Sequence, residues 1–332
     1  MDNSTFSNIK SVTIRNFKSV KSLTLSDCRR INVLIGRPNV GKSNILEALS
    51  LFDVPYMVNS SNKSLKNLLR IENTADLFHN GISSSTIEVT ADGNSLNVTR
   101  GSNNGLSVDI TAKDEISRYS FTSALALSTK KEPTVLPDIL AYFFPGHFSA
   151  ESSNLSFLLP PSGANLMETV ASMPELKSNL AELFHGYGLK MMFDSGSRQI
   201  KAMRENGLDM FLVPFTSLAD SLQRLIFYKA AIESNRDKTI CFEEPEAHTF
   251  PPYISNVVND IIASGSNQFF LTTHSPYVIS SLLESAGDEL AVFVVDMAEN
   301  ATIAKRLTDE QLQEAYDNGM DMFYNLEAYL GA

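Results

Sequence analysis

Cysteine, basic residues and long apolar runs are scarce in this chain of 332 residues. The two cysteines, Cys28 and Cys241, exclude a disulfide framework, and Cys241 lies in an apolar pattern typical of a buried strand. No apolar run reaches the roughly 18 residues that a membrane-spanning helix needs. Residues 1–10 also lack the apolar core of a secretion signal. These absences exclude an integral membrane protein and favour a cytoplasmic protein in a reducing compartment.

Basic residues are too few for a surface devoted to nucleic acid. Lys and Arg number 27 against 38 Asp and Glu, which gives a net charge of −11. Because DNA affinity comes largely from neutralised phosphates, this charge disfavours strong non-specific DNA binding, although a local basic patch stays open. Apolar residues make up 43% of the chain, which is enough to bury a full core.

The two ends of the chain alternate between strand and helix patterns. Residues 31–35 form an apolar, β-branched run that stops at Gly36, and residues 43–52 carry apolar side chains at helical spacing. Further strands are predicted at 8–14, 23–25, 239–242, 268–272 and 290–296, and a further helix at 217–234. This pattern predicts an α/β fold whose core is built from both ends of the chain.

The interior of the chain has a different character. Residues 86–110 contain short alternating runs separated by the turn sequences 92–94 and 101–105, which predicts antiparallel hairpins. A helical piece is predicted at 167–187 within an otherwise irregular stretch. We therefore expect a core of residues 1–85 and 207–332, interrupted by an inserted antiparallel and helical lobe of residues 86–206.

A phosphate-binding loop follows the strand at 31–35. Residues 36–43 match the G-x-x-x-x-G-K-S/T pattern at every position, between a predicted strand and a predicted helix. The glycines let backbone N–H groups surround an anion, and the helix N-terminus adds partial positive charge. Lys42 is expected to reach the β- and γ-phosphates, and the Ser43 hydroxyl to bind Mg²⁺. The predicted nucleotide contacts are Gly36, Arg37, Pro38, Asn39, Val40, Gly41, Lys42, Ser43 and Asn44.

The loop by itself does not separate ATP from GTP, and its sequence is similar to the first motif of Era-like GTPases. A GTPase also needs Asp-x-x-Gly, but none of the 16 glycines has Asp three positions earlier. It also needs Asn-Lys-x-Asp to recognise guanine, and Asn62-Lys63 is followed by Ser64 and Leu65 instead. The GTPase interpretation therefore fails twice, and ATP is the expected nucleotide.

Two carboxylates and a histidine follow two later strands. Glu243 and Glu244 end the strand predicted at 239–242, and His274 follows the strand predicted at 268–272. Because ligands of a parallel sheet bind at the carboxyl ends of its strands, we expect these residues near the phosphate loop, at the end of a neighbouring strand. Glu243 is predicted to hold Mg²⁺, Glu244 to orient and deprotonate the attacking water, and His274 to sense the γ-phosphate. For the acids taken alone, a solvated acidic loop is an equally good explanation.

The order of these motifs resembles that of ABC-type ATPases, and among them the soluble RecF, SMC and OLD-like AAA ATPases. Five segments carry the resemblance: residues 14–19, 36–43, 159–166, 243–248 and 273–276. It implies an ATPase head with a mostly parallel core sheet, ATP and Mg²⁺ as cofactors, and at least two copies that clamp ATP head to tail. It also implies a separate effector protein, with a Toprim nuclease as one candidate, and a role in anti-phage defence or DNA repair.

The chain departs from the family pattern at the signature segment, which in these families contacts ATP bound to the opposite subunit. The corresponding residues 216–224 contain no glycine, and Ser217 and Ser221 are the candidate contacts. A capping role for Ser217 or Asp220 at the start of the helix is an equally good explanation.

Other departures concern the metal ligand, the base and the end of the chain. Glu243 stands where these families usually have Asp. Arg15 and Phe17 are candidates for flanking the base or ribose, although a strand end with Arg and Lys is more often a solvated edge. The 58 residues after His274 are too few for a Toprim domain, so any nuclease chemistry is expected in a partner chain.

Two functions of different class fit the sequence. The first is an ATPase whose cycle controls a partner effector. The second is an ATP-switched scaffold that turns over negligibly and sequesters a partner. A transporter ATPase is disfavoured by the unusual Leu-Pro-Pro-Ser-Gly segment at 159–163.

Overall fold

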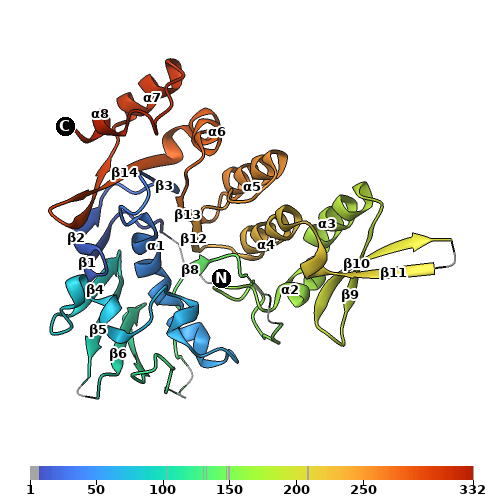
Figure 1. The fold of residues 1–332 in the computed structure, drawn as a ribbon, viewed down its shortest axis with the longest axis horizontal. Coiled ribbons are helices and arrows are strands. Elements are labelled where there is room, and N and C mark those ends of the chain that lie inside the picture. Colours follow the sequence, from blue (N-terminus) through green and yellow to red (C-terminus); the bar gives the residue numbers. More distant parts are fainter. Residues whose placement is uncertain are drawn as a thin grey trace. The chain divides into compact units, whose positions relative to one another are not determined.

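The computed structural model describes residues 7–101, 103–129, 131, 133–146, 148, 150–207 and 209–331 (Figure 1). The chain forms two compact units. The first contains residues 1–141, 237–244 and 266–332, and the second contains residues 142–236 and 245–265. Within the described part of the chain, no helix combines the length and the apolar character needed to cross a bilayer.

The core of the first unit is a six-stranded, mostly parallel sheet. Its order is β15 (Ala301–Arg306), β14 (Leu290–Ala298), β3 (Ile31–Ile35), β13 (Gln268–Thr272), β12 (Thr239–Glu243) and β8 (Ile139–Tyr142). Strands β14, β3, β13 and β12 pair in parallel, and β15 pairs antiparallel to β14. Every residue of β3 and β13 is buried, as expected for parallel strands covered on both faces.

Helices and short 3₁₀ segments surround this sheet. Helix α1 (Lys42–Ser50) contacts β12 and β13, and α6 (Pro276–Ala286) and α8 (Leu326–Leu330) contact β14. The remaining helical elements of this unit are α7 (Asp309–Asp317), η1 (Leu51–Val58), η2 (Leu65–Asn67), η3 (Thr74–Leu77), η4 (His79–Gly81) and η6 (Gly287–Glu289).

The first unit also contains a six-stranded antiparallel sheet. Its order is β2 (Val20–Leu25), β1 (Val12–Phe17), β4 (Ile87–Ala91), β5 (Asn94–Arg100), β6 (Leu106–Ala112) and β7 (Glu115–Phe121). The predicted hairpins are confirmed, and Gly93 takes a φ of 70° in the tight turn between β4 and β5.

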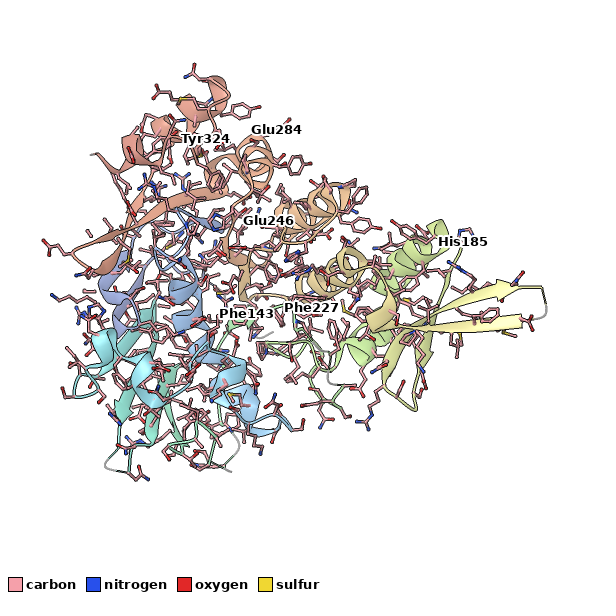
Figure 2. All side chains as sticks on the ribbon, in the orientation of Figure 1. Phe143, His185, Phe227, Glu246, Glu284 and Tyr324 are labelled. Carbon is pink, nitrogen blue, oxygen red and sulfur yellow. The ribbon has the colours of Figure 1, made fainter. Side chains whose placement is uncertain are left out.

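The second unit combines four helices with a small antiparallel sheet. The helices are α2 (Leu166–Ser172), α3 (Pro174–Gly186), α4 (Asp220–Ser234) and α5 (Pro251–Ala263), with a 3₁₀ turn η5 (Phe215–Ser217). The strands are β9 (Lys190–Asp194), β10 (Gln199–Asn206) and β11 (Asp209–Pro214). Its interior is rich in aromatic side chains, and Phe227 of α4 (Figure 2) makes edge-to-face contacts with Tyr142, Phe144 and Phe148.

The structure confirms the α/β class and corrects the expected division of the chain. The hairpins from residue 86 onward belong to the first unit because β4 pairs with β1. Residues 207–236 lie in the second unit instead, because β11 pairs with β10 and α4 packs on α5. The helix predicted at 167–187 is two helices, since Pro174 starts α3 with its fixed φ and no backbone donor.

Candidate active site

Three strands of the parallel sheet bring the predicted motifs to one edge. In the sheet register, Glu243 of β12 lies beside Thr272 of β13, which lies beside Leu34 of β3. The chain leaves these strands as the Glu243–Glu244 pair, as Thr273–His274 and as the loop that starts at Gly36. One detail differs from expectation: β13 lies between the loop strand and the acid strand, so the histidine belongs to the middle strand of the site.

Two glycines of the loop are required by their surroundings. Gly36 has a φ of 153°, and a Cβ atom there would lie 2.2 Å from the backbone oxygen of Val295. Gly41 has a φ of 100°, and its Cβ would lie 2.1 Å from Thr302 Oγ1 and 2.7 Å from Ser19 Oγ. Both approaches are far below van der Waals contact, so the loop closes only with glycine at these positions.

The remaining loop residues are the buried Val40 and the exposed residues 37–39, which we call the crest of the loop. Val40 is buried, and its carbonyl accepts a hydrogen bond of 3.0 Å from Thr302 Oγ1. Arg37, Pro38 and Asn39 are exposed. Arg37 pairs with Glu327 of α8, and Asn39 has a left-handed φ of 62°.

Helix α1 begins directly after the loop and carries three of the predicted contacts. Gly41 caps its N-terminus, so the helix dipole points its positive end at the loop. Ser43 is half-buried in the first turn. Asn44 Nδ2 donates to Ser19 Oγ at 2.6 Å, and Ser19 Oγ in turn contacts Thr302 Oγ1 at 2.6 Å. Residues of β15 and of the turn between β1 and β2 therefore hold the loop from behind, which sequence reasoning missed.

Lys42 is a buried ammonium held by the loop itself. Its Nζ donates to the carbonyl oxygens of Gly36 at 2.8 Å and Arg37 at 2.7 Å. Burial lowers the pKa of Lys42, and the nearby Glu244 and Glu243 carboxylates partly oppose this effect. A cation that carbonyls hold in a desolvated loop is poised to exchange those partners for an anion.

Glu244 and His274 face each other across the strand ends. His274 Nε2 lies 3.4 Å from Glu244 Oε1, and the ring stacks on Phe323 with 6.4 Å between ring centroids. Glu244 has a left-handed φ of 42°, and its N–H donates to Thr272 O at 3.1 Å. Burial and the Lys42 charge lower the pKa of His274, although Glu244 raises it, so the imidazole is neutral at physiological pH.

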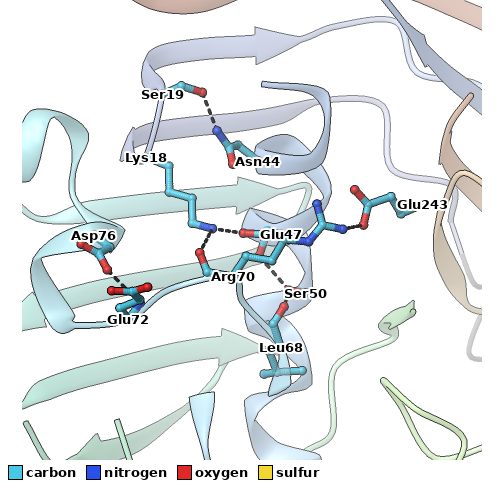
Figure 3. A network of polar contacts seen from close by, with 10 residues as sticks. All are labelled: Lys18, Ser19, Asn44, Glu47, Ser50, Leu68, Arg70, Glu72, Asp76 and Glu243. Atoms are coloured by element: carbon cyan, nitrogen blue, oxygen red, sulfur yellow. Dashed lines mark hydrogen bonds and ion pairs between the residues drawn. The ribbon is translucent and has the colours of Figure 1, made fainter. Parts of the chain in front are cut away.

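Glu243 joins a charged network that was not predicted. Its Oε2 accepts from Arg70, and Arg70 Nε lies 3.9 Å from Glu47 Oε1 of α1 (Figure 3). Glu47 also pairs with Lys18, whose Nζ donates to the Arg70 carbonyl at 3.2 Å. A faint signal was present in the sequence, because Ser43, Glu47 and Ser50 form a polar stripe at helical spacing directly after the loop.

The residues proposed to flank the base are placed otherwise than expected. Phe17 is fully buried at the end of β1, so it is a core residue and its ring is closed to a ligand; this prediction is wrong. Arg15 is exposed, and its Nη1 pairs with Glu88 of the adjacent strand β4 at 3.1 Å. This placement agrees with the solvated-edge explanation.

The signature candidates lie in the second unit. Helix α4 starts at Asp220 with Ala219 as its N-cap and no side-chain cap, so neither Ser217 nor Asp220 caps it. Asp220 instead accepts from Arg224 one turn later, at 2.8 Å. Ser217 is exposed, whereas the Ser221 hydroxyl donates to the His248 carbonyl at 3.1 Å and accepts from the Phe250 N–H. Ser221 is thus engaged within its own unit.

The donor chemistry at the sheet edge fits Mg²⁺. Mg²⁺ prefers oxygen ligands and usually takes one or two from the protein, together with phosphate oxygens and water. The Ser43 hydroxyl and the Glu243 carboxylate are oxygen donors of this kind. Among the described residues, no group of three or more His, Cys, Asp and Glu side chains could hold an ion.

Sequence comparison relates the chain to nucleotide-hydrolysing proteins. The sequence model of the AAA ATPase domain family matches residues 8–181, which is more than half of the 332 residues. An "ATP/GTP phosphatase" from Helicobacter pylori is 40% identical over 63 residues, covering 19% of this chain and 16% of that protein. An uncharacterized protein from Methanocaldococcus jannaschii is 43% identical over 44 residues, or 13% of this chain and 20% of that protein. The chain therefore spans a fifth or less of these relatives.

Structural comparison identifies the fold. The structure of an Smc head bound to the C-winged helix domain of ScpA aligns with a TM-score of 0.51 and 14% identity, covering 93% of this chain and 100% of that one. At this identity the likeness concerns the fold alone, and it confirms a fold like that of an Smc head. The family match supports ATP binding and hydrolysis.

Proposed function

The chain belongs to the AAA ATPase domain family, and on this premise we propose that it hydrolyses ATP at the sheet edge formed by β3, β13 and β12. The observation that carries the proposal is the register of these strands, which gathers the loop, the Glu243–Glu244 pair and His274. In this arrangement the contacts of each residue fit one role in ATP hydrolysis.

The loop and Lys42 bind the triphosphate. The N–H groups of the loop and of the first turn of α1 surround the phosphates, and Lys42 leaves the carbonyls of Gly36 and Arg37 for phosphate oxygens. The exchange favours ATP because a charge-assisted bond to an anion is stronger than one to a neutral carbonyl.

Glu244 and His274 act on the attacking water and on the γ-phosphate. Glu244 accepts the proton of the water and orients its lone pair, as a carboxylate at hydrogen-bonding distance can. His274 is neutral and has a single N–H. Its Nε2 lies 3.4 Å from Glu244 Oε1, so the ring holds Glu244 in the free protein and turns its one N–H to the transferring phosphoryl group when ATP is bound. Ser43 and Glu243 would hold Mg²⁺, which would supply positive charge to offset the charge of the phosphates.

We further propose that two copies close head to tail around ATP and that this closure controls a separate effector protein. The supporting observation is the open sheet edge, where His274 and the Arg37–Asn39 crest are exposed to an approaching surface. Ser217 remains the candidate for a contact with nucleotide across such a dimer, because its side chain is exposed. A role in anti-phage defence or DNA repair, with a Toprim nuclease as one candidate effector, belongs to the same proposal.

The experiment is steady-state phosphate release together with ATP binding for the wild type and Glu244→Gln. We expect the variant to retain ATP affinity within about twofold and to lose phosphate release by about 10²-fold or more, the size of a general-base contribution. Release at the wild-type rate would remove Glu244 from catalysis. Binding without release in the wild type itself would favour a scaffold over an ATPase.

A further inference from the structure

Arg70 links two carboxylates, Glu47 of α1 and Glu243 of β12, the proposed metal ligand. Its guanidinium pairs with Glu243 through Nη2, while its Nε lies 3.9 Å from Glu47 Oε1. The carboxylate side chains are 13% and 4% exposed, whereas the Arg70 side chain is 68% exposed. The anions are thus fixed within the protein, and the cation between them is the partner that is free to turn.

The backbone of Arg70 is held independently of its side chain. Lys18 Nζ donates to the Arg70 carbonyl at 3.2 Å and pairs with Glu47 (Figure 3). The preceding residues Leu68 and Leu69 are buried. Because these contacts fix the main chain, the guanidinium can change partner by rotating its side chain alone.

We propose that Arg70 is a positioning residue that alternates between two carboxylate partners, Glu243 and Glu47. The inference rests on the proposed function: Arg70 holds Glu243 in the free protein, and it moves to Glu47 when Mg²⁺ and nucleotide arrive. Glu243 Oε2, which accepts from the guanidinium, is not available to a divalent cation while the pair holds, and two cations beside one carboxylate repel each other. Glu47 can become the second partner because its Oε2 pairs with Lys18, while its Oε1 already lies 3.9 Å from Arg70 Nε.

The arrangement makes metal binding a competition within the protein. Without metal, the Arg70 charge offsets that of the Glu243 carboxylate and holds it in place. The ion must displace Arg70 before it can bind Glu243. Removing Arg70 should therefore tighten metal binding, which is the opposite of what removing a nucleotide ligand would do.

The test is Mn²⁺ binding, measured as free Mn²⁺ by electron paramagnetic resonance with and without the non-hydrolysable analogue adenosine 5′-(β,γ-imido)triphosphate. Compared with the wild type, Arg70→Gln should bind Mn²⁺ about fivefold more tightly in the presence of the analogue, as expected for loss of one partly exposed ion pair. Glu47→Gln, which removes the second carboxylate partner of Arg70, should weaken Mn²⁺ binding. In a Glu243→Gln background, Arg70→Gln should change nothing.

Arg118→Gln is the matched control, because Arg118 is also an exposed arginine paired with a carboxylate, Asp109, at 2.7 Å. It should leave Mn²⁺ affinity unchanged. Equal or weaker Mn²⁺ binding by Arg70→Gln overturns the inference, as does weaker binding of the analogue without metal, since Arg70 would then contact phosphate. If Arg70→Gln does not fold, Arg70→Lys, which keeps the charge and loses the fork, should give a smaller change in the same direction. Failure of the wild type to bind the analogue with Mn²⁺ would instead refute the proposed function.

Discussion

Replacement of Lys42 by methionine is the most direct test of the nucleotide site. Methionine fills a volume similar to the lysine stem and removes only the ammonium. In the free protein that ammonium donates to two carbonyls at 2.8 and 2.7 Å, so binding ATP exchanges these neutral acceptors for anionic ones.

The structure sets the expected size of the effect. The net gain from the exchange is that of about one hydrogen bond to a charged group, roughly 1.5–3 kcal/mol. This corresponds to an increase of about ten- to 150-fold in the Kd for ATP. Stability should change little, because loss of the ammonium leaves two carbonyls unpaired but also removes a charge whose pKa burial has lowered.

The assay is calorimetric titration with ATP and Mg²⁺, paired with thermal unfolding of the same samples. Lys63→Met serves as the control, since Lys63 is exposed in a loop and should alter neither quantity. An ATP Kd for Lys42→Met within twofold of the wild type, in protein that unfolds at the wild-type temperature, would refute the assignment of Lys42 to the site.

Three further predictions follow from individual contacts. Gly41→Ala should lose nucleotide binding and about 1–3 kcal/mol of stability or more because of its φ of 100° and the approach to Thr302, whereas Gly93→Ala, with a φ of 70° and open space, should lose only about 1 kcal/mol; chemical denaturation compares them. His274→Ala should slow phosphate release by about 10²-fold and leave ATP affinity within about twofold, and a loss of folding would show that the ring is structural. Burial raises the pKa of Asp53 well above its ordinary value, so wild-type stability should fall as pH rises from about 4 through that raised pKa. Asn at position 53 does not titrate, so the Tm of Asp53→Asn relative to the wild type should rise with pH above about 4, and a Tm difference that does not change with pH would contradict the shift.

The strands that end in motifs were predictable because a short apolar run that ends at a glycine or at paired acids fits few structures other than a buried strand. The strands at 31–35 and 268–272 have the predicted bounds. Their register brings the loop and His274 together, as the motif order suggested. What the pattern could not give was the strand order, since β13 is inserted between β3 and β12 by a pairing of residues far apart in the chain.

The parts that were missed lack a periodic signal or depend on distant partners. In the sheet of β9, β10 and β11, only the first half of β10 alternates, between partly buried and buried positions, so this region looked irregular. Phe17 was a candidate for flanking the base because it lies in the segment 14–19 that carries the family resemblance, but it pairs with Val20 of β2 and with Phe78 and is fully buried. Arg70 carries no motif, and its meaning comes only from the fold that brings it to Glu243.

The pairing of β3 has a consequence for how the protein is made. Both neighbours of this strand, β13 and β14, come from residues 268–298. Leu34 therefore has no strand partners for its backbone until Thr272 and Phe293 have been synthesised. During synthesis from the N-terminus, the ribosome delivers this mostly apolar strand long before the segments that cover it. The ATP pocket therefore cannot assemble until translation has passed β14, and the early chain needs protection by chaperones or by transient contacts in the meantime.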